Sequence, residues 1–254
     1  MAEVKPLKDK VILITGAGQG IGAALAKYVA DRGAIVSLSD ISGDTVKAVE
    51  QSIRDEDPEF QGLSQIVDVC DPGSVKRWVE ETKNEFGRID GCVNSAGILQ
   101  KEIVPLTEIK LEDWQRVLDV NLTGLFNCLQ HQMAAIADGG SIVNIASVAG
   151  MSGVAGIGAY AASKHGVVGL TKVAAGEGAA RRVRVNVVCP NVVDTPMAKQ
   201  LAERSGGQLK GKTLSLLKGL VQPEEIAALI SFLLCDETRF ITKAVYPIDG
   251  GFSG

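Results

Sequence analysis

Short apolar runs alternate with helix-length segments along the whole chain, and this alternation limits the folds open to it. The first run, residues 11–15, is continuous and closed by a glycine, which is typical of a strand buried on both faces of a parallel sheet. Further runs of this kind cover residues 34–40, 63–69, 89–94, 141–147, 183–189 and 244–249. Helical patterns cover residues 21–33, 44–57, 71–86, 111–120 and 121–137 between them. We therefore predict an α/β fold, a single Rossmann-like doubly wound domain over residues 1–254, with a seven-stranded parallel sheet and helices on both faces.

A glycine-rich loop, TGAGQGIG, follows the first apolar run directly and covers residues 15–22. Glycines allow a tight turn and a close approach of the backbone to a pyrophosphate, whose charge the start of the next helix favours. The motif alone is a weak signal, but its place between a buried strand and an amphipathic helix strengthens it. We predict a dinucleotide site at this loop.

Asp40 ends the second apolar run, at about the distance where dinucleotide folds carry an acid for the adenosine ribose hydroxyls. A carboxylate there would repel a 2′-phosphate, and neither Ser39 nor Ile41 supplies a cation that would attract one. The sequence therefore predicts NAD in preference to NADP. The alternative is that Asp40 only begins a turn.

Charge and cysteine content exclude several classes of protein. The net charge is −4, and we interpret the only compact basic run, residues 181–184, as a solvated helix end, so no nucleic-acid partner is predicted. The five cysteines are scattered without a CxxC pair, which argues against both a disulfide framework and a metal site. The N-terminus lacks the apolar core of a signal peptide, and no apolar stretch is long enough to span a bilayer. We predict a cytoplasmic protein with no metal and no membrane contact.

Tyr160 and Lys164 stand four positions apart in a segment rich in glycine and alanine. On a helix this spacing places both side chains on one face, with Cβ atoms roughly 5–6 Å apart. An ammonium beside a phenol lowers the phenol pKa, because the positive charge favours the phenolate. An ordinary helix pair is the alternative, and these two residues alone do not decide between them.

The chain resembles the short-chain dehydrogenase/reductase family over essentially its whole length, because several motifs of that family occur in it in the family's order. The family pattern TGxxxGIG matches residues 15–22, NNAG matches residues 94–97, and YxxxK matches Tyr160 and Lys164. Asn121 in VLDVNLTG and Ser147 in IVNIASVAG match the family's catalytic asparagine and serine. The resemblance implies an NAD(P)-dependent oxidoreductase that interconverts a secondary alcohol and a ketone by hydride transfer.

The resemblance also implies a role for each catalytic residue. An unperturbed tyrosine, with a pKa near 10, is too weak a base at neutral pH. Lys164, together with the positive nicotinamide of the oxidised cofactor, would lower the pKa of Tyr160, and its ammonium would bind the nicotinamide ribose. Ser147 would hold the substrate oxygen, and Asn121 would position Lys164 through a water. The small residues around the Tyr160 and Lys164 pair leave room for both ligands.

The remaining cofactor contacts carry over by position. The implied cofactor-binding residues are Gly16, Gln19, Gly20, Ile21, Gly22, Asp40, Asp68, Val69, Asn94, Ala96, Gly97, Tyr160, Lys164, Pro190, Val193 and Thr195. Two positions depart from the family's motifs: Ser95 replaces an asparagine, and Asn191 replaces the glycine of PGxVxT. Asparagine tolerates positive φ, so the turn can survive, but its amide would project beside the nicotinamide or substrate.

The three segments that choose the substrate in this family are mostly apolar here. They supply Ile98, Leu99, Val148, Met151, Val154, Ile157, Met197 and Leu201. The only cations near them in sequence are Lys101, Lys199, Lys210 and Lys212. This favours an apolar small-molecule alcohol or ketone, with a cyclic, steroid-like or terpenoid-like metabolite as the class we predict. We also predict a mobile substrate lid at about residues 196–219.

Two alternatives remain open at this point. One is a non-catalytic dinucleotide sensor or scaffold on the same fold. The other is a family member that catalyses an atypical biosynthetic step, such as an enoyl reduction or a ring closure, and Asn191 is the one feature that encourages it. Family resemblance further implies a homotetramer or dimer, with interfaces at the Tyr160 helix, the helix near Asn121 and the C-terminal strand.

Overall fold

The computed structural model describes residues 5–205 and 215–253, and a seven-stranded parallel sheet lies at their centre. The strands are β1 (Val11–Thr15), β2 (Ile35–Asp40), β3 (Gly62–Ile66), β4 (Gly91–Asn94), β5 (Ser141–Ile145), β6 (Arg184–Pro190) and β7 (Val245–Ile248). Their order across the sheet is β3-β2-β1-β4-β5-β6-β7, and every neighbouring pair is parallel. The strand order reverses between β1 and β4, which is where doubly wound sheets bind ligands. The predicted fold class is confirmed.

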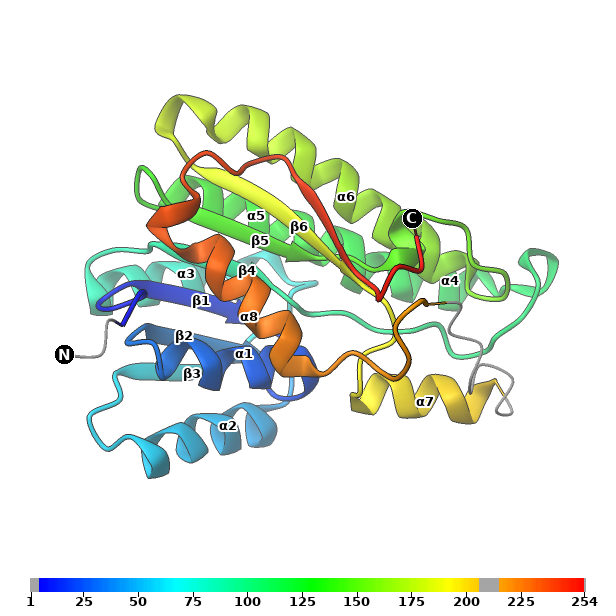
Figure 1. Ribbon diagram of the computed structural model, residues 1–254, viewed down its shortest axis with the longest axis horizontal. Helices are drawn as coiled ribbons and strands as arrows, with labels where there is room; N and C mark the ends of the chain where they lie inside the picture. Colours follow the sequence, from blue (N-terminus) through cyan, green and yellow to red (C-terminus); the bar gives the residue numbers. More distant parts are fainter. Residues whose placement is uncertain (1–4, 206–214, 254) are drawn as a thin grey trace.

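Helices cover both faces of the sheet (Figure 1). The helices are α1 (Gly20–Ala30), α2 (Gly43–Glu56), α3 (Pro72–Phe86), α4 (Leu111–Leu118), α5 (Gly124–Ala135), α6 (Gly158–Gly178), α7 (Pro196–Arg204) and α8 (Pro223–Leu234). In Figure 1, α1, α2 and α8 lie in front of the sheet and α3, α5 and α6 lie behind it, while α7 lies beyond the carboxyl ends of the strands.

The continuous apolar strands are explained by these two helical layers. Ile12 and Ile14 of β1 belong to the core cluster that includes α1 and α8, whereas Val11 and Leu13 belong to the cluster that includes Trp78 of α3. Successive side chains of a strand point to opposite faces, so each β1 residue meets one of two buried layers. An alternating polar pattern would leave polar groups buried on one side.

Residues 111–137 do not form the two separate helices that the sequence predicts over 111–120 and 121–137. Instead α4 continues into a π-helical segment, Asp119–Thr123, and then into α5. The wider turn of a π segment is rare and is frequent at functional sites. Its position here places Asn121, which is 1% exposed, in the interior. Several predicted strands are also shorter in the structure: β3 ends at Ile66 and not at residue 69, and β5 ends at Ile145 and not at residue 147. The strands β2, β4 and β7 each lack one or two of the predicted residues at their ends.

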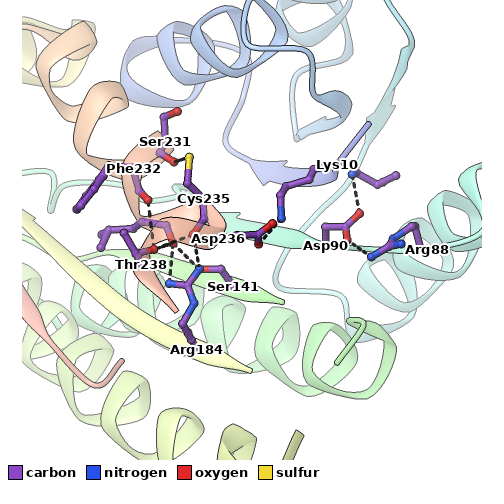
Figure 2. A network of polar contacts seen from close by, with 12 residues as sticks. Lys10, Arg88, Asp90, Ser141, Arg184, Ser231, Phe232, Cys235, Asp236 and Thr238 are labelled. Atoms are coloured by element: carbon purple, nitrogen blue, oxygen red, sulfur yellow. Dashed lines mark hydrogen bonds and ion pairs between the residues drawn. The ribbon is translucent and has the colours of Figure 1, made fainter. Parts of the chain in front are cut away.

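Only part of the basic run at residues 181–184 is the solvated helix end predicted from the sequence, because Arg182 is exposed but Arg184 is buried. The buried Arg184 guanidinium donates from Nη1 to Leu233 O at 2.8 Å and from Nη2 to Cys235 O at 3.1 Å, at the end of α8 (Figure 2). Arg181 donates in the same way to Met133 O and Ile136 O at the end of α5. The last carbonyls of a helix lack intrahelical partners and carry negative partial charge, so they attract these cations.

We expect Arg184→Met to lower the free energy of unfolding by about 3 kcal/mol, because it removes charge-assisted hydrogen bonds from a buried site. Denaturant unfolding of both proteins at one pH measures the change. Arg182→Met is the matched control, since Arg182 is exposed, and surface changes of this kind usually stay within about 0.5 kcal/mol. Equal losses in the two variants would contradict a capping role for Arg184.

Candidate active site

Two adjoining cavities lie at the carboxyl ends of the strands. One measures about 260 Å³ and is mostly apolar, and the other measures about 270 Å³ and runs along the glycine-rich loop and the end of β2. They share the lining residues Ile21, Ser95, Gly97, Thr195 and Met197. The two cavities are therefore neighbouring parts of one cleft at the point where the strand order reverses.

The glycine-rich turn is packed so closely that side chains are excluded. Gly16 has φ +65°, and a Cβ on it would lie 2.8 Å from backbone atoms of Ala96; a Cβ on Gly22 would lie 2.1 Å from Gly16 O. Thr15 Oγ1 accepts from the backbone N–H groups of Ser95 and Ala96 at 3.1 and 3.2 Å. These two hydrogen bonds hold the end of β1 against the end of β4. Gly16 and Gly20 of the loop line the cleft.

Asp40 organises the turn with both carboxylate oxygens. Its Oδ2 accepts from Gly18 N at 2.9 Å and its Oδ1 accepts from Ser42 N at 3.0 Å. The turn that was the alternative interpretation of Asp40 is therefore present, and the same carboxylate also lines the 270 Å³ cavity. The two interpretations are compatible, since each carboxylate oxygen can accept more than one hydrogen bond.

Most of the predicted cofactor residues lie in the cleft. Those that line the 270 Å³ cavity are Gly16, Gln19, Gly20, Ile21, Asp40, Asp68, Val69, Ala96, Gly97 and Thr195. Tyr160, Lys164, Pro190 and Val193 line the 260 Å³ cavity instead. Gly22 and Asn94 line neither, because Gly22 supports the turn from behind and the Asn94 amide is bonded inward to Gln132 and Asn144.

Ser147, Tyr160 and Lys164 line the same apolar cavity. Ser147 follows β5, and Tyr160 and Lys164 share one face of α6. Lys164 Nζ donates to Ile145 O at 2.9 Å and lies 5.6 Å from the centre of the Tyr160 ring. The fold therefore brings a hydroxyl, a phenol and an ammonium together in the apolar cavity, next to the 270 Å³ cavity.

The lowered phenol pKa predicted from the Lys164 charge is not found in the chain by itself. Burial raises the pKa of Tyr160 to about 12, although a hydrogen bond with Ser147 opposes the rise. Burial also lowers the pKa of Lys164 to about 8. The ammonium points to a backbone carbonyl rather than to the phenol, so the cost of burying the phenolate outweighs the charge beside it.

Asn121 connects the loop after β4 to α6. Its Oδ1 accepts from Ile98 N at 2.8 Å, and its Nδ2 donates to Ile98 O at 3.0 Å and to Ser163 Oγ at 3.0 Å. None of these bonds reaches Lys164 directly. A Cβ on Gly97 would lie 3.4 Å from both Asn121 Oδ1 and Lys164 Nζ, so the two groups flank one position in the loop.

Asn191 does not use the positive φ that was expected to explain its tolerance. The positive-φ residues other than glycine among those the structure describes are Asp9, Arg182 and Lys243. Asn191 Nδ2 donates to Ser215 Oγ at 3.0 Å, and its backbone N–H donates to Ile248 O at 3.2 Å. The amide thus joins the end of β6 to the chain that follows α7.

Part of the predicted lid is helical. The segment that follows β6 begins as α7, with Thr195 Oγ1 accepting from Ala198 N as its N-cap. The described part of the lid comprises residues 196–205 and 215–219, whereas residues 206–214, with Lys210 and Lys212, lie outside the described residues.

Most of the predicted substrate residues meet at the 260 Å³ cavity. Leu99, Val148, Val154, Ile157, Met197 and Leu201 line it. Ile98 lies on the other cavity, and Met151 packs against the core cluster behind the sheet. Sequence reasoning missed Phe252, which lines the cavity from the C-terminal segment after Gly250 and Gly251 and belongs to no motif. Lys164 is the only charged side chain among the described residues that line this cavity.

The described parts of the chain contain neither a metal cluster nor a membrane-spanning helix. No group of metal-ligating side chains occurs there that could hold an ion. Over the same residues, no helix combines the length and the apolar character needed to cross a membrane. The doubly wound sheet with a glycine-rich turn at its switch point defines a dinucleotide-binding fold of the Rossmann type.

Comparison with known proteins identifies the family. The family model described as Enoyl-(Acyl carrier protein) reductase matches residues 16–253. Short-chain dehydrogenase/reductase aba4 of Botryotinia fuckeliana is 38% identical over 254 residues, 98% of each chain. Cyclohexanol dehydrogenase of Acinetobacter sp. (strain SE19) is 38% identical over 249 residues, 96% of this chain and 95% of that protein. This chain belongs to the short-chain dehydrogenase/reductase family.

A solved structure agrees with this assignment. The crystal structure of a short chain dehydrogenase from Mycobacterium paratuberculosis bound to NAD matches with a TM-score of 0.89 at 29% identity. The match covers 98% of this chain and 99% of the other. The resemblance stated from the motifs is thus confirmed at the level of the family and of the fold.

Proposed function

We propose that this protein is an NAD-dependent oxidoreductase that interconverts a secondary alcohol and a ketone on an apolar, cyclic substrate. The catalytic domain would span residues 1–254. The observation that carries the proposal is the cavity that brings Ser147, Tyr160 and Lys164 together beside mostly apolar walls. The adjoining cavity fits a dinucleotide, because Gly16 and Gly20 bring the backbone of the loop to its wall and Asp40 also lines it.

Asp40 supports NAD over NADP. Its carboxylate would bind ribose hydroxyls and repel a 2′-phosphate. No lysine or arginine lines the 270 Å³ cavity among the described residues, so nothing there would offset that repulsion. The Mycobacterium paratuberculosis relative, which binds NAD, is consistent with this preference.

The proposed chemistry gives a role to Ser147, Tyr160, Lys164 and Asn121. Bound NAD supplies the hydride acceptor when an alcohol is oxidised. Ser147 Oγ would hold the substrate oxygen, and Tyr160 Oη would take its proton. Lys164 would stabilise the phenolate by its charge and bind the nicotinamide ribose. Asn121 would hold the loop after β4 against α6, and so fix where Lys164 lies.

The apolar cavity supports a ring-shaped substrate without charge. Its walls carry aliphatic side chains and Phe252, and an ionised substrate would lose its hydration there without gaining a cation other than Lys164. The relative from Acinetobacter sp. (strain SE19) is a cyclohexanol dehydrogenase. A steroid-like or terpenoid-like metabolite fits the same chemistry.

The deciding experiment is a titration with NAD and with NADP, followed by a panel of cyclic and acyclic secondary alcohols scored by formation of reduced cofactor. We expect NAD-selective turnover of cyclic alcohols such as cyclohexanol. Turnover of charged sugars or hydroxy acids alone would contradict the substrate class. Tight NAD binding without turnover would favour a sensor, and reduction of a carbon–carbon double bond would favour the enoyl reaction.

We expect Asp40→Asn to reduce the preference for NAD over NADP by about tenfold or more, because the substitution removes a negative charge close to the 2′ position. Asparagine keeps the shape and can still accept a hydrogen bond from the turn. Dissociation constants for both cofactors measure the change. Asp55→Asn, on the exposed face of α2, is the control and should leave the ratio unchanged. A ratio that Asp40→Asn leaves at its original value would remove the basis for NAD selectivity.

Exposed apolar side chains support assembly into a homo-oligomer. Phe126 of α5 is 49% exposed and Val173 of α6 is 55% exposed, on two of the elements predicted to form interfaces. Phe240, just before β7, is 98% exposed. Light scattering on the purified protein would give the number of subunits. The cytoplasmic location stays a prediction.

A further inference from the structure

Gln100 joins two of the loops that form the walls of the apolar cavity. Its side chain is 2% exposed, and its Nε2 donates to Glu102 O at 2.7 Å and to Gly156 O at 2.9 Å. The first acceptor belongs to the loop after β4 and the second to the loop after β5. A backbone hydrogen bond from Val104 N to Gly156 O, at 3.1 Å, runs beside these contacts.

The orientation of the Gln100 amide is fixed by its two acceptors. A flipped amide would point Oε1 at two carbonyl oxygens, which repel it. In the observed orientation Oε1 is buried and has no hydrogen-bond partner among the described residues. Burial of an unpartnered acceptor destabilises a folded chain. The chain thus keeps a costly glutamine at a position where an apolar side chain would fill the same space.

The two loops meet closely where Gln100 holds them. Gly156 has φ +89°, and a Cβ on it would lie 2.7 Å from Ile103 Cγ2. Ile103 and Tyr160 both pack against a small buried cluster that includes Ile157. The contact between the loops therefore continues to the proposed catalytic tyrosine through apolar packing.

A third wall of the cavity is attached to the same residue. Arg204, at the end of α7, donates from Nη1 to the backbone oxygen of Gln100 at 2.7 Å. Arg116 donates to the oxygen of the preceding residue, Leu99, at 2.8 Å. Leu99 lines the apolar cavity, as do Ile157 of the second loop and Leu201 of α7. Three separate walls are thus held around one buried side chain.

We propose that Gln100 is a positioning residue that sets the width of the substrate cavity. It lines neither cavity, and it acts through Leu99 and Ile157, which line the apolar cavity from the loop after β4 and the loop after β5. This role rests on the proposed function, in which the cavity holds the alcohol or ketone. Loss of the amide would let the two loops separate, and the substrate would lose contact on one side while the cofactor cavity stays intact.

Gln100→Met tests this role, because methionine keeps the length of the side chain and removes both donors. With cyclohexanol and NAD as the probes, we expect KM for cyclohexanol to rise about tenfold, within the range that loss of two buried hydrogen bonds produces. We expect kcat and the Kd for NAD to change less than about twofold. Gln100→Asn, which is too short to reach Gly156, should raise KM in the same way.

Asn186→Leu is the matched control. The Asn186 amide is also buried and also bonds two backbone groups, Ile241 O at 2.9 Å and Ala244 N at 3.1 Å, but it lines neither cavity. A general loss of stability would appear in this variant as well. An unchanged KM in the Gln100 variants, or an equal rise in Asn186→Leu, would overturn the proposal.

Hydrogen exchange at the Val104 amide separates this inference from the proposed function, since it needs no turnover. Faster exchange in Gln100→Met but not in Asn186→Leu would support the positioning role even if wild-type protein oxidised no alcohol. A wild-type protein that oxidised no alcohol would contradict the proposed function and would leave the role of Gln100 unaffected. Equal exchange rates at Val104 in Gln100→Met and in wild-type protein would overturn the role of Gln100.

Discussion

Tyr160→Phe is expected to lower kcat/KM for alcohol oxidation by about 10³-fold or more, because it removes the one group proposed to take the substrate's proton. The ring stays in place, and the cofactor cavity is lined by other residues. We therefore expect the Kd for NAD to change less than about twofold. Formation of reduced cofactor and a titration with NAD on the same sample measure the two quantities.

Tyr28→Phe provides the control for this substitution. Tyr28 lies on α1, where its ring packs under the Arg32 guanidinium, and it lines neither cavity. It should therefore keep full activity. Turnover by Tyr160→Phe within about tenfold of wild type would mean that another group accepts the proton, and the proposed roles would have to be reassigned.

The raised pKa of Tyr160 adds a condition to this mechanism. With a pKa of about 12 in the chain by itself, very little phenolate is present at neutral pH. The nearby ammonium alone does not lower it, since Lys164 is bonded to Ile145 O. The positive charge of an oxidised nicotinamide, when bound, would be a further source of stabilisation. The phenol would become an effective base only once cofactor is bound, which is when a base is required.

The order of the elements could be predicted from the sequence because the sheet is buried on both faces. Each strand must be apolar at successive positions, and this pattern is distinct from that of the intervening helices. The start of α3 could be predicted as well, because aspartate followed by proline is a typical helix N-cap and first helical residue. In the structure Asp71 accepts from Gly73 N, and Pro72 begins the helix. The π segment at Asn121 was not predicted, because the one-residue shift that it puts into the apolar pattern looks in the sequence like a break between two helices.

The candidate catalytic residues could be located in the sequence for a different reason. Ser147, Tyr160 and Lys164 belong to motifs with fixed spacing, so the family resemblance locates them without a structure. Gln100, Phe252 and the bond between Asn191 and Ser215 depend on contacts between segments far apart in the chain. Such contacts bind backbone groups or fill space, and neither leaves a pattern in one sequence. The shape of the substrate cavity could therefore not be predicted from the sequence.

Lys164→Met is expected to lower kcat/KM by about 10²-fold or more and, at the same time, to stabilise the ligand-free protein at neutral pH. Lys164 is 4% exposed, and burial lowers its pKa from 10.5 to about 8. Below pH 8 both the folded and the unfolded chain carry this proton, so the cost of burying the charge is fully present. The shift corresponds to roughly 3 kcal/mol, and the lost bond to Ile145 O offsets about 1 kcal/mol of it. We expect a net gain of about 2 kcal/mol at pH 7.

The pH dependence distinguishes this cause from better packing. Between pH 8 and 10.5 the unfolded chain binds a proton at Lys164 that the folded chain has released, so wild-type stability rises with pH. Tyr160, with its pKa raised from 10 to about 12, acts in the opposite sense only above pH 10. The gain of Lys164→Met over wild type should therefore shrink steadily from pH 8 to pH 10 in denaturant unfolding. Lys172→Met, exposed on the same helix, should show no such trend. A gain that stays constant with pH would mean that the pKa of Lys164 is the same in the folded and the unfolded chain, so that the gain comes from packing and not from relief of a buried charge.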